Sequence, residues 1–287
     1  MINEFSLEKL DIPCGWSRGE GDWAGVAAVV ARGETVEVIQ EVGSTLWQGN
    51  LPAGHSLYWE GENLSTIKAR IWISFTQRRF SPKSALPKVQ WHPRVLWIGI
   101  GCERGISREF IETAIQNVCR SYHLAESAIA GIATIDTKAN ESGIVELCQG
   151  RNWPLKTFSA EVLSSVEVPN PSNIVAKEVG TPSVAEAAAL CAIELISCTI
   201  VNNRQDACST ILTNRQDACS TILSNRQDAC STKSESACGV DILPAQKSLL
   251  VPKQIIRTKN PPLLQGGVKV GSAVTVAVAV CAIDYLG

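Results

Sequence analysis

Acidic and basic side chains gather in one loop of the chain at a spacing that could do chemistry. Residues 133–141 read Ala-Thr-Ile-Asp-Thr-Lys-Ala-Asn-Glu and place Asp136, Lys138 and Glu141 directly after an apolar stretch typical of a strand. Ligands of open α/β sheets bind at the carboxyl ends of the strands. An acid beside a cation could there activate water and stabilise a developing oxyanion. The alternative is a helix start in which Asp136 or Asn140 caps and Glu141 favours the dipole; spacing alone favours this alternative.

A glycine-rich segment forms the second candidate site. Residues 99–105 read Gly-Ile-Gly-Cys-Glu-Arg-Gly and lie between a buried strand and a helix that Ser107 would cap. Backbone amides in such a turn can face an anion, helped by the helix dipole, and Arg104 adds a positive charge suited to carboxylates. The plainer alternative is a tight turn that needs glycines. The segment contributes these residues to the predicted substrate site: Gly101, Cys102, Glu103, Arg104 and Gly105.

A nucleotide site at the same glycines is disfavoured. Two of the glycines have the spacing of the dinucleotide fingerprint, but the third comes one residue late. No acidic residue lies at the expected offset after it. A nucleotide-dependent α/β enzyme is therefore the weakest of the functions considered.

Hydroxyl groups and one further cation complete the predicted substrate site. Thr181 is expected to cap a helix whose first turn contains Pro182. The hydroxyls of Thr181 and Ser183 and the free amides of that helix could hold an oxygen ligand, although a structural cap is the commoner role. Lys253 ends an apolar stretch typical of a strand and could point into the same cleft. The three histidines lie in no recognisable triad, and no phosphate loop or His-rich metal set is present.

Composition excludes several classes of protein. Of the 287 residues, 45% are hydrophobic and 19% charged, which supports a buried core, and the net charge of −2 argues against a nucleic-acid binder. The first ten residues do not form a secretion signal, and the longest apolar runs are too short or interrupted for a membrane span, which needs roughly 20 apolar residues. We therefore expect a cytoplasmic protein without a membrane partner. Eleven cysteines without a CxxC pair give a poor metal or redox signal, and most would be free thiols.

The element pattern divides the chain at about residue 94. Residues 1–75 are expected to form a small strand-rich region, with strands at 35–40 and 69–74 and a helix at 22–31 that Asp22 caps. Residues 76–93, rich in proline and basic side chains, are expected to be a linker. From residue 94 to residue 287, strands alternate with helices, beginning with the continuous apolar run 95–100. This alternation predicts an α/β fold, a three-layer sandwich with a mostly parallel sheet.

The expected order within this second part is as follows. Strands are predicted at 95–100, 128–135 and 155–159, with helices at 107–122, 141–151 and 183–200, and the runs 249–251 and 274–280 close the sheet. A repeat insertion at 202–238 interrupts the pattern, with near-identical copies 11 residues apart. A surface excursion is the preferred interpretation, because long loop insertions cost little.

Several of these segments together resemble one family. Residues 99–105, 133–141, 158–161, 168–172 and 180–188 resemble, in order and spacing, the C-terminal domain of the cobalamin biosynthesis protein CbiG family, a domain shared with the CobE proteins. The resemblance covers about residues 93–192 and resumes at 249. Residues 20–75 resemble more loosely the middle region of CbiG proteins. The N-terminal domain of that family has no counterpart here, and the repeat insertion falls inside the C-terminal domain.

The resemblance implies a place in cobalamin (vitamin B12) biosynthesis. The family hydrolyses the δ-lactone of cobalt-precorrin-5A and releases acetaldehyde, giving cobalt-precorrin-5B. Cobalt is carried by the tetrapyrrole substrate, so the protein itself would need no cofactor and no metal ligands. The many carboxylates of the substrate would be anchored by Arg104, Lys138 and Lys253. Lactone opening would use Lys138 with Asp136 or Glu141 as the catalytic groups.

A second function stays open beside the hydrolase. A chain of this kind could bind or carry a corrinoid intermediate without catalysis, as a CobE-type domain would. The missing N-terminal domain favours the carrier, and the retained middle region favours the hydrolase. Besides the tetrapyrrole, other enzymes of the cobalamin pathway are candidate partners.

Overall fold

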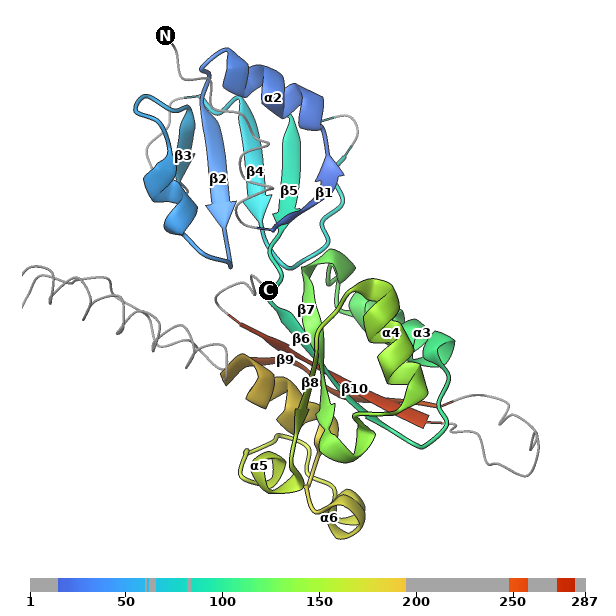
Figure 1. Ribbon diagram of the computed structural model, residues 1–287. Coiled ribbons are helices and arrows are strands. Elements are labelled where there is room, and N and C mark those ends of the chain that lie inside the picture. The colour runs from blue at the N-terminus through green and yellow to red at the C-terminus, as the bar shows by residue number, and fades with distance from the viewer. Residues whose placement is uncertain are drawn as a thin grey trace, which may run out of the picture.

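Two five-stranded sheets organise the chain (Figure 1). The computed structural model describes residues 15–59, 61, 66–81, 84–194, 248–257 and 273–281. The predicted repeat insertion at 202–238 lies outside the described residues. No helix within the described ranges is long and apolar enough to cross a membrane.

The first sheet has the order β1-β5-β4-β2-β3. β2 (Val36–Gln40) pairs in parallel with β3 (Leu57–Trp59) and with β4 (Ala69–Ile73), and β4 pairs in parallel with β5 (Lys88–His92). β1 (Ser17–Gly21) closes the other edge antiparallel to β5, and the short helix η2 (Leu46–Asn50) links β2 to β3. The strands predicted at 35–40 and 69–74 are therefore confirmed.

One helix covers a face of this first sheet (Figure 1). α2 (Trp23–Ala31) begins at Asp22, whose Oδ1 accepts a hydrogen bond from Gly25 N at 2.8 Å, as its predicted capping role requires. Its buried Val26 and Val29 pack against alternate residues of the strands. Trp16 and Trp47 belong to the same core.

The predicted linker at 76–93 is in part a strand. Residues 88–92 form β5, which lies between β1 and β4 and carries the fully buried Val89 and Trp91. Prolines flank this five-residue run on both sides, at positions 87 and 93. Because proline is typical of turns and loops, the sequence pattern predicted a linker and not a short strand. The prediction of a linker was wrong for these residues.

The second sheet has the order β8-β7-β6-β10-β9. β6 (Leu96–Cys102), β7 (Ile129–Ile135) and β8 (Leu155–Phe158) are parallel, whereas β10 (Ala273–Val280) runs antiparallel to β6 and to β9 (Ser248–Arg257). Four of the five strands thus run in one direction, and the α/β class is confirmed. The continuous burial of β7 shows why these strands read as unbroken apolar runs, since both of their faces are covered.

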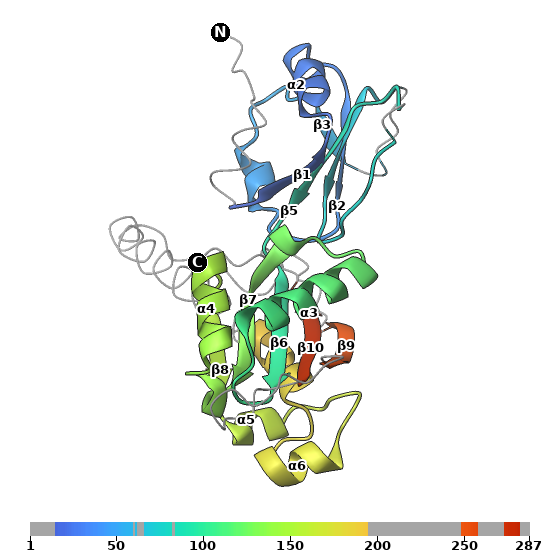
Figure 2. The same ribbon diagram turned by 90° about the vertical axis from the view of Figure 1, so that its right-hand side faces the viewer.

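Helices cover both faces of the second sheet, which gives three layers (Figures 1 and 2). α3 (Arg108–Ser121), capped by Ser107 as predicted, and α4 (Ser142–Arg151) bury one face. The other face packs against α5 (Ala160–Ser164), α6 (Asn173–Val179) and a helical segment at 184–194. Two single turns, η3 (Glu126–Ala128) and η4 (Asp136–Lys138), flank β7.

The two halves are joined by backbone hydrogen bonds as well as by the chain itself. Gln77 N donates to His123 O at 2.7 Å and Ala125 N donates to Phe75 O at 2.9 Å. Between them, Thr76 and Leu124 form an isolated antiparallel bridge. The segment after β4 therefore pairs with the segment after α3.

The helical segment 184–194 approaches β6 so closely that no side chain fits between them. A Cβ at Gly99 would lie 1.8 Å from Ala185 O, whereas a Cβ at Gly101 would meet nothing closer than 3.5 Å. Alanines at 187, 188, 189 and 192 face the same sheet and permit this approach. Gly99 is therefore a packing requirement, and Gly101 is not.

We expect Gly99→Ala to destabilise the fold by about 3 kcal/mol, because the helix must move away from the strand. The matched variant Gly101→Ala is expected to change stability by less than about 1 kcal/mol. Urea denaturation followed by circular dichroism measures both. Equal stabilities for the two variants would contradict the close packing at Gly99.

Candidate functional site

A pocket of about 610 Å³ lies where β6 and β7 end. Its walls come from the end of β6, from η4, from α6, from the start of the 184–194 helix and from β9 and β10. The carboxyl edge of a sheet with helices on both faces is where α/β proteins commonly bind ligands. The lining residues are Gly101, Cys102, Glu103, Arg104, Lys138, Ser172, Val175, Glu178, Val179, Ser183, Val184, Ala185, Lys253, Ile255, Ala273 and Thr275.

Most of the sequence-predicted site residues meet in this pocket, although they come from distant segments. Four residues of the glycine-rich segment line the pocket, namely Gly101, Cys102, Glu103 and Arg104. Three residues from later segments line it as well: Lys138, Ser183 and Lys253. The remaining predicted residues, Gly105, Thr181, Asp136 and Glu141, are not among its lining residues.

Glu141 holds Lys138 at the pocket wall. Lys138 Nζ lies 3.3 Å from Glu141 Oε2, and the two side chains are only 14% and 10% exposed. The other carboxylate oxygen, Oε1, accepts a hydrogen bond from Gly105 N at 2.7 Å. The backbone amide of Gly105, predicted to face an anionic ligand, thus donates to a carboxylate of its own chain. This amide is therefore not free to bind a ligand.

The side chain of Asp136 forms a hydrogen bond within its own loop. The side chain is exposed, and Oδ1 accepts from Thr137 N at 2.7 Å. α4 begins at Glu141 without any side-chain cap, so the alternative in which Asp136 or Asn140 caps this helix was wrong. Of the three predicted catalytic residues, Lys138 alone lines the pocket.

The glycine-rich segment is partly strand. Gly101 and Cys102 belong to β6 and pair with Thr275 and Val274 of β10. The turn begins only at Glu103, whose N donates to Ala273 O at 3.3 Å, and Gly105 supplies its positive φ of 71°. The expectation that the glycine-rich segment after residue 100 forms a turn was wrong for Gly101 and Cys102, because the sequence does not reveal that β10 extends the pairing of β6 to its last residues.

Thr181 does not cap the helix it precedes, contrary to prediction. The helix begins at 184, and Ser183 O accepts its Ala187 N at 3.2 Å. Gly180, with φ 79°, ends α6, so Thr181 and Pro182 lie between the two helices and belong to neither. Thr181 Oγ1 and Ser183 Oγ are both buried and have no hydrogen-bond partner in the described part of the chain. Such orphaned hydroxyls are uncommon and suit an oxygen ligand at this edge.

Sequence reasoning missed the buried acid beside the pocket. Glu186 is fully buried, and its Oε1 accepts from Asn170 Nδ2 at 2.9 Å and from Lys253 N at 3.0 Å. Lys253 Nζ in turn donates to Asn170 O. The available signal was an acid inside the alanine-rich run 185–189, on a helix that must be buried.

The pocket carries more cations than a neutral ligand would need. Lys138 and Lys253 line its walls, and Arg104 lies exposed at its rim. The first amides of the 184–194 helix have no intrahelical acceptor, and Val184 and Ala185 form part of the wall. These groups favour an anionic ligand, and the carboxylates of Glu103 and Glu178 restrict where its negative charges can lie.

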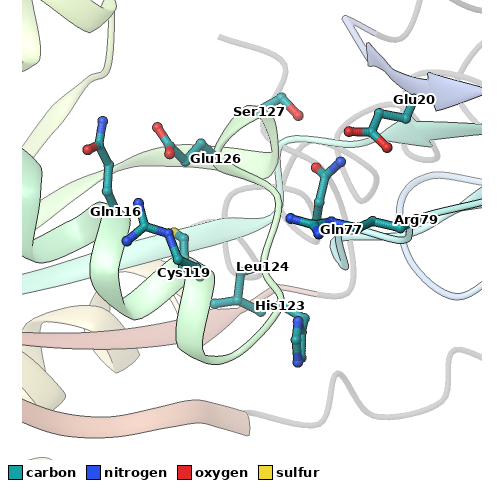
Figure 3. Close-up of a pocket in the computed structure, with 10 residues that line it drawn as sticks. Glu20, Gln77, Arg79, Gln116, Cys119, His123, Leu124, Glu126 and Ser127 are labelled. Carbon is teal, nitrogen blue, oxygen red and sulfur yellow. The ribbon is translucent and has the colours of Figure 1, made fainter.

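A second hollow of about 770 Å³ lies between the two halves (Figure 3). Gln77 and Arg79 border it from the first half, and His123 and Glu126 from the second. Its charges are mixed, with acids and bases on its walls. No residue of the predicted site lines it.

The cysteine in the pocket is a poor nucleophile. Burial is the main reason that the pKa of the Cys102 thiol rises from 9.0 to about 11; Lys138 lowers this pKa, and Glu141 and Glu103 contribute to raising it. At neutral pH the thiol is therefore protonated. Among the described residues no group of three or more His, Cys, Asp or Glu side chains could hold a metal ion.

We expect alkylation of Cys102 by iodoacetamide at pH 7 to be about a hundredfold slower than that of a thiol with a pKa of 9, and to rise with pH towards 11. Lys138→Met should slow it further, because it removes the charge that favours the thiolate. Peptide mass spectrometry after timed quenching measures the rate at this residue. A rate at pH 7 equal to that of free cysteine would show that the thiol is not shielded.

Two family models match the chain. The cobalamin synthesis G C-terminus matches residues 96–218, and the cobalamin biosynthesis central region matches residues 6–93. Curated relatives are the cobalt-precorrin-5A hydrolases of Priestia megaterium, 28% identical over 58% of this chain and 46% of the relative, and of Salmonella typhimurium, 29% identical over 53% and 42%. The chain thus spans less than half the length of the curated relatives it matches.

Solved structures from the same pathway are more distant. CobE, a protein from the cobalamin (vitamin B12) biosynthetic pathway, is 20% identical, with a TM-score of 0.41 over 67% of this chain and 92% of that protein. A cobalamin biosynthesis protein G homolog from Sulfolobus solfataricus is 16% identical, with a TM-score of 0.36 over 98% and 61%. The family assignment therefore rests on the two family models, which together match well over half of the sequence. The chain belongs to the cobalamin biosynthesis G (CbiG) family and carries the central region and C-terminal domain of that family.

Proposed function

We propose that the chain hydrolyses the δ-lactone of cobalt-precorrin-5A, giving cobalt-precorrin-5B and acetaldehyde. The observation that carries this proposal is the cation-lined pocket at the strand ends, whose lining residues up to position 185 lie within the match to the C-terminal family model. The hydrolase names of the curated relatives support the same reaction. The place in cobalamin biosynthesis follows from the family itself.

The pocket suits one edge of a tetrapyrrole rich in acetate and propionate groups. Its volume of about 610 Å³ is in the range of small-molecule sites, and we expect part of the macrocycle to stay outside. Arg104 and Lys253 would anchor carboxylates at the rim, with Ser183 and the first helical amides completing an oxygen site. Thr181 supports this wall from its buried position.

Lys138 would act at the reacting lactone. Water adds to the lactone carbonyl, and the ammonium stabilises the oxyanion that forms. The acyl–oxygen bond then breaks to leave a carboxylate and a hydroxyl. The hydroxyl-bearing two-carbon unit leaves as acetaldehyde when its carbon–carbon bond to the ring breaks, and a proton returns to the ring carbon. Glu141, bonded to both Lys138 and Gly105, would hold the ammonium in place and would take the proton of the attacking water.

A binding or carrier function is the second candidate. It is favoured because no histidine among the described residues lines the pocket, its cysteine is protonated at neutral pH, and the Glu141 carboxylate already bonds to Lys138 and Gly105. With these features the pocket can still bind an anion, but it offers few side chains that could transfer a proton. The two candidates share a ligand and differ in turnover.

Incubation of the purified chain with cobalt-precorrin-5A, with an assay for acetaldehyde, separates the two candidates. Acetaldehyde at many equivalents of the protein supports the hydrolase. Saturable absorption changes without acetaldehyde support the carrier. Neither signal would overturn both proposals.

Lys138→Met is expected to lower turnover by about a hundredfold or more, because it removes the cation that faces the oxyanion. Asp136→Asn is the matched control from the same turn and is expected to change turnover less than about twofold, since the Asp136 side chain is exposed and accepts a hydrogen bond from Thr137 of its own loop. Initial rates of acetaldehyde release measure both. A large loss in Asp136→Asn with none in Lys138→Met would reverse these roles.

Arg104→Met is expected to raise KM about tenfold with little change in kcat, because a rim contact binds the substrate and the transition state equally. Arg78→Met removes an arginine from the first half, away from this pocket, and serves as the control for lost charge. Steady-state kinetics give the two constants. A fall in kcat at constant KM would place Arg104 at the reacting centre instead.

A further inference from the structure

The start of the 184–194 helix has the spacing of a capping box but does not use it. Ser183 and Glu186 stand three residues apart, the pattern in which a serine hydroxyl and an acid bond to each other's backbone amide. Here Ser183 Oγ has no partner among the described residues, and Glu186 Oε1 bonds to Asn170 and Lys253. Neither side chain therefore makes the hydrogen bond that a capping box would give it.

The bonds of Glu186 join three separate segments at the pocket. The acid lies on the helix, Asn170 lies in the loop before α6, and Lys253 lies on β9. Asn170 and Lys253 also bond to each other, because Lys253 Nζ donates to Asn170 O. We call these three mutually bonded residues the junction. Moving Glu186 would therefore move the only lysine that β9 contributes to the pocket wall.

Burial makes this arrangement costly. A carboxylate without solvent contact needs full hydrogen bonding, yet Glu186 Oε2 is buried and has no partner in the described part of the chain. Thr181 Oγ1 and Ser183 Oγ, five and three residues before Glu186, have no partner among the described residues either. A stretch with three unfilled polar atoms beside an open pocket is the mark of a site built for a ligand rather than for stability.

We propose that Glu186 is a positioning residue that, instead of capping its own helix, fixes Lys253 and Asn170 so that the Lys253 ammonium and the Ser183 hydroxyl face one carboxylate of the ligand. This inference rests on the proposed function for the identity of the ligand, a tetrapyrrole bearing carboxylates. It assigns to the pocket a carboxylate subsite between β9 and the helix start, separate from Lys138.

The experiment is a double-mutant cycle on Glu186 and Lys253. Absorption titration with cobalt-precorrin-5A gives Kd for the wild type, Glu186→Ala, Lys253→Met and the double variant. Glu186→Ala is expected to raise Kd about tenfold, but less than about twofold further when Lys253 is already methionine, because its effect passes through Lys253. Glu186→Gln should stay within about threefold of the wild type, since Oε1 makes both of the observed bonds.

A ligand-free measurement runs beside the titration. Exchange of the Lys253 backbone amide, followed by NMR, should speed up in Glu186→Ala and stay slow in Glu186→Gln, because that amide donates to Oε1. Glu146→Ala on the exposed face of α4 is the control for a lost acid and should change neither Kd nor exchange. If Glu186→Ala does not fold, Asn170→Ala takes its place, because it removes one arm of the junction and leaves the acid.

The outcomes separate this inference from the proposed function. Kd effects of Glu186 and Lys253 that multiply in the double variant would overturn the positioning role, and so would an unchanged Kd in Glu186→Ala. If the wild type binds no tetrapyrrole, the proposed function falls, and amide exchange alone decides. Slow exchange at Lys253 in Glu186→Ala would then refute the junction, and fast exchange with recovery in Glu186→Gln would support it.

Discussion

The close approach of the 184–194 helix to β6 is the constraint on which the site depends. The backbone of Ala185 occupies the space that a side chain at position 99 would need. This contact places the helix start beside the last residues of β6, with Ser183 and Val184 at the pocket and Glu186 buried below it. A helix one side chain further away could not form the junction with β9, and the pocket would lose a wall.

The strand order turns that contact into a site. β6 lies between β7 and β10, so the residues that follow β7 and those of β9 and β10 come to one edge although they are more than a hundred residues apart in sequence. The three cations therefore come from three segments: the turn after β6, η4 and β9. Each of the two lysines is held by an acid that does not itself line the pocket. Glu141 bonds directly to the Lys138 ammonium, whereas Glu186 bonds to the backbone of Lys253. The pocket keeps its positive charge available to a ligand while the acids fix where that charge lies.

Much of the fold could be predicted from sequence because its signals are local. The apolar run before Gly99, the capping by Ser107 and the helix at 142–151 were predicted within one or two residues. β5 was missed because prolines bracket it, and the roles of Gly101 and Thr181 were misread because they depend on β10 and on where α6 ends. The alanine-rich run signals that Glu186 is buried, but its bonds to Asn170 and Lys253 could not be predicted, because these partners lie 16 and 67 residues away in sequence. Local patterns determine the elements, whereas the site depends on pairings between distant segments.

The most direct test of the account is a structure of the chain bound to cobalt-precorrin-5A. We expect carboxylates of the tetrapyrrole to lie at Arg104 and at Lys253 with Ser183, and the lactone to lie next to Lys138. A tetrapyrrole bound instead in the hollow between Gln77 and His123, with the pocket at the ends of β6 and β7 empty, would contradict it.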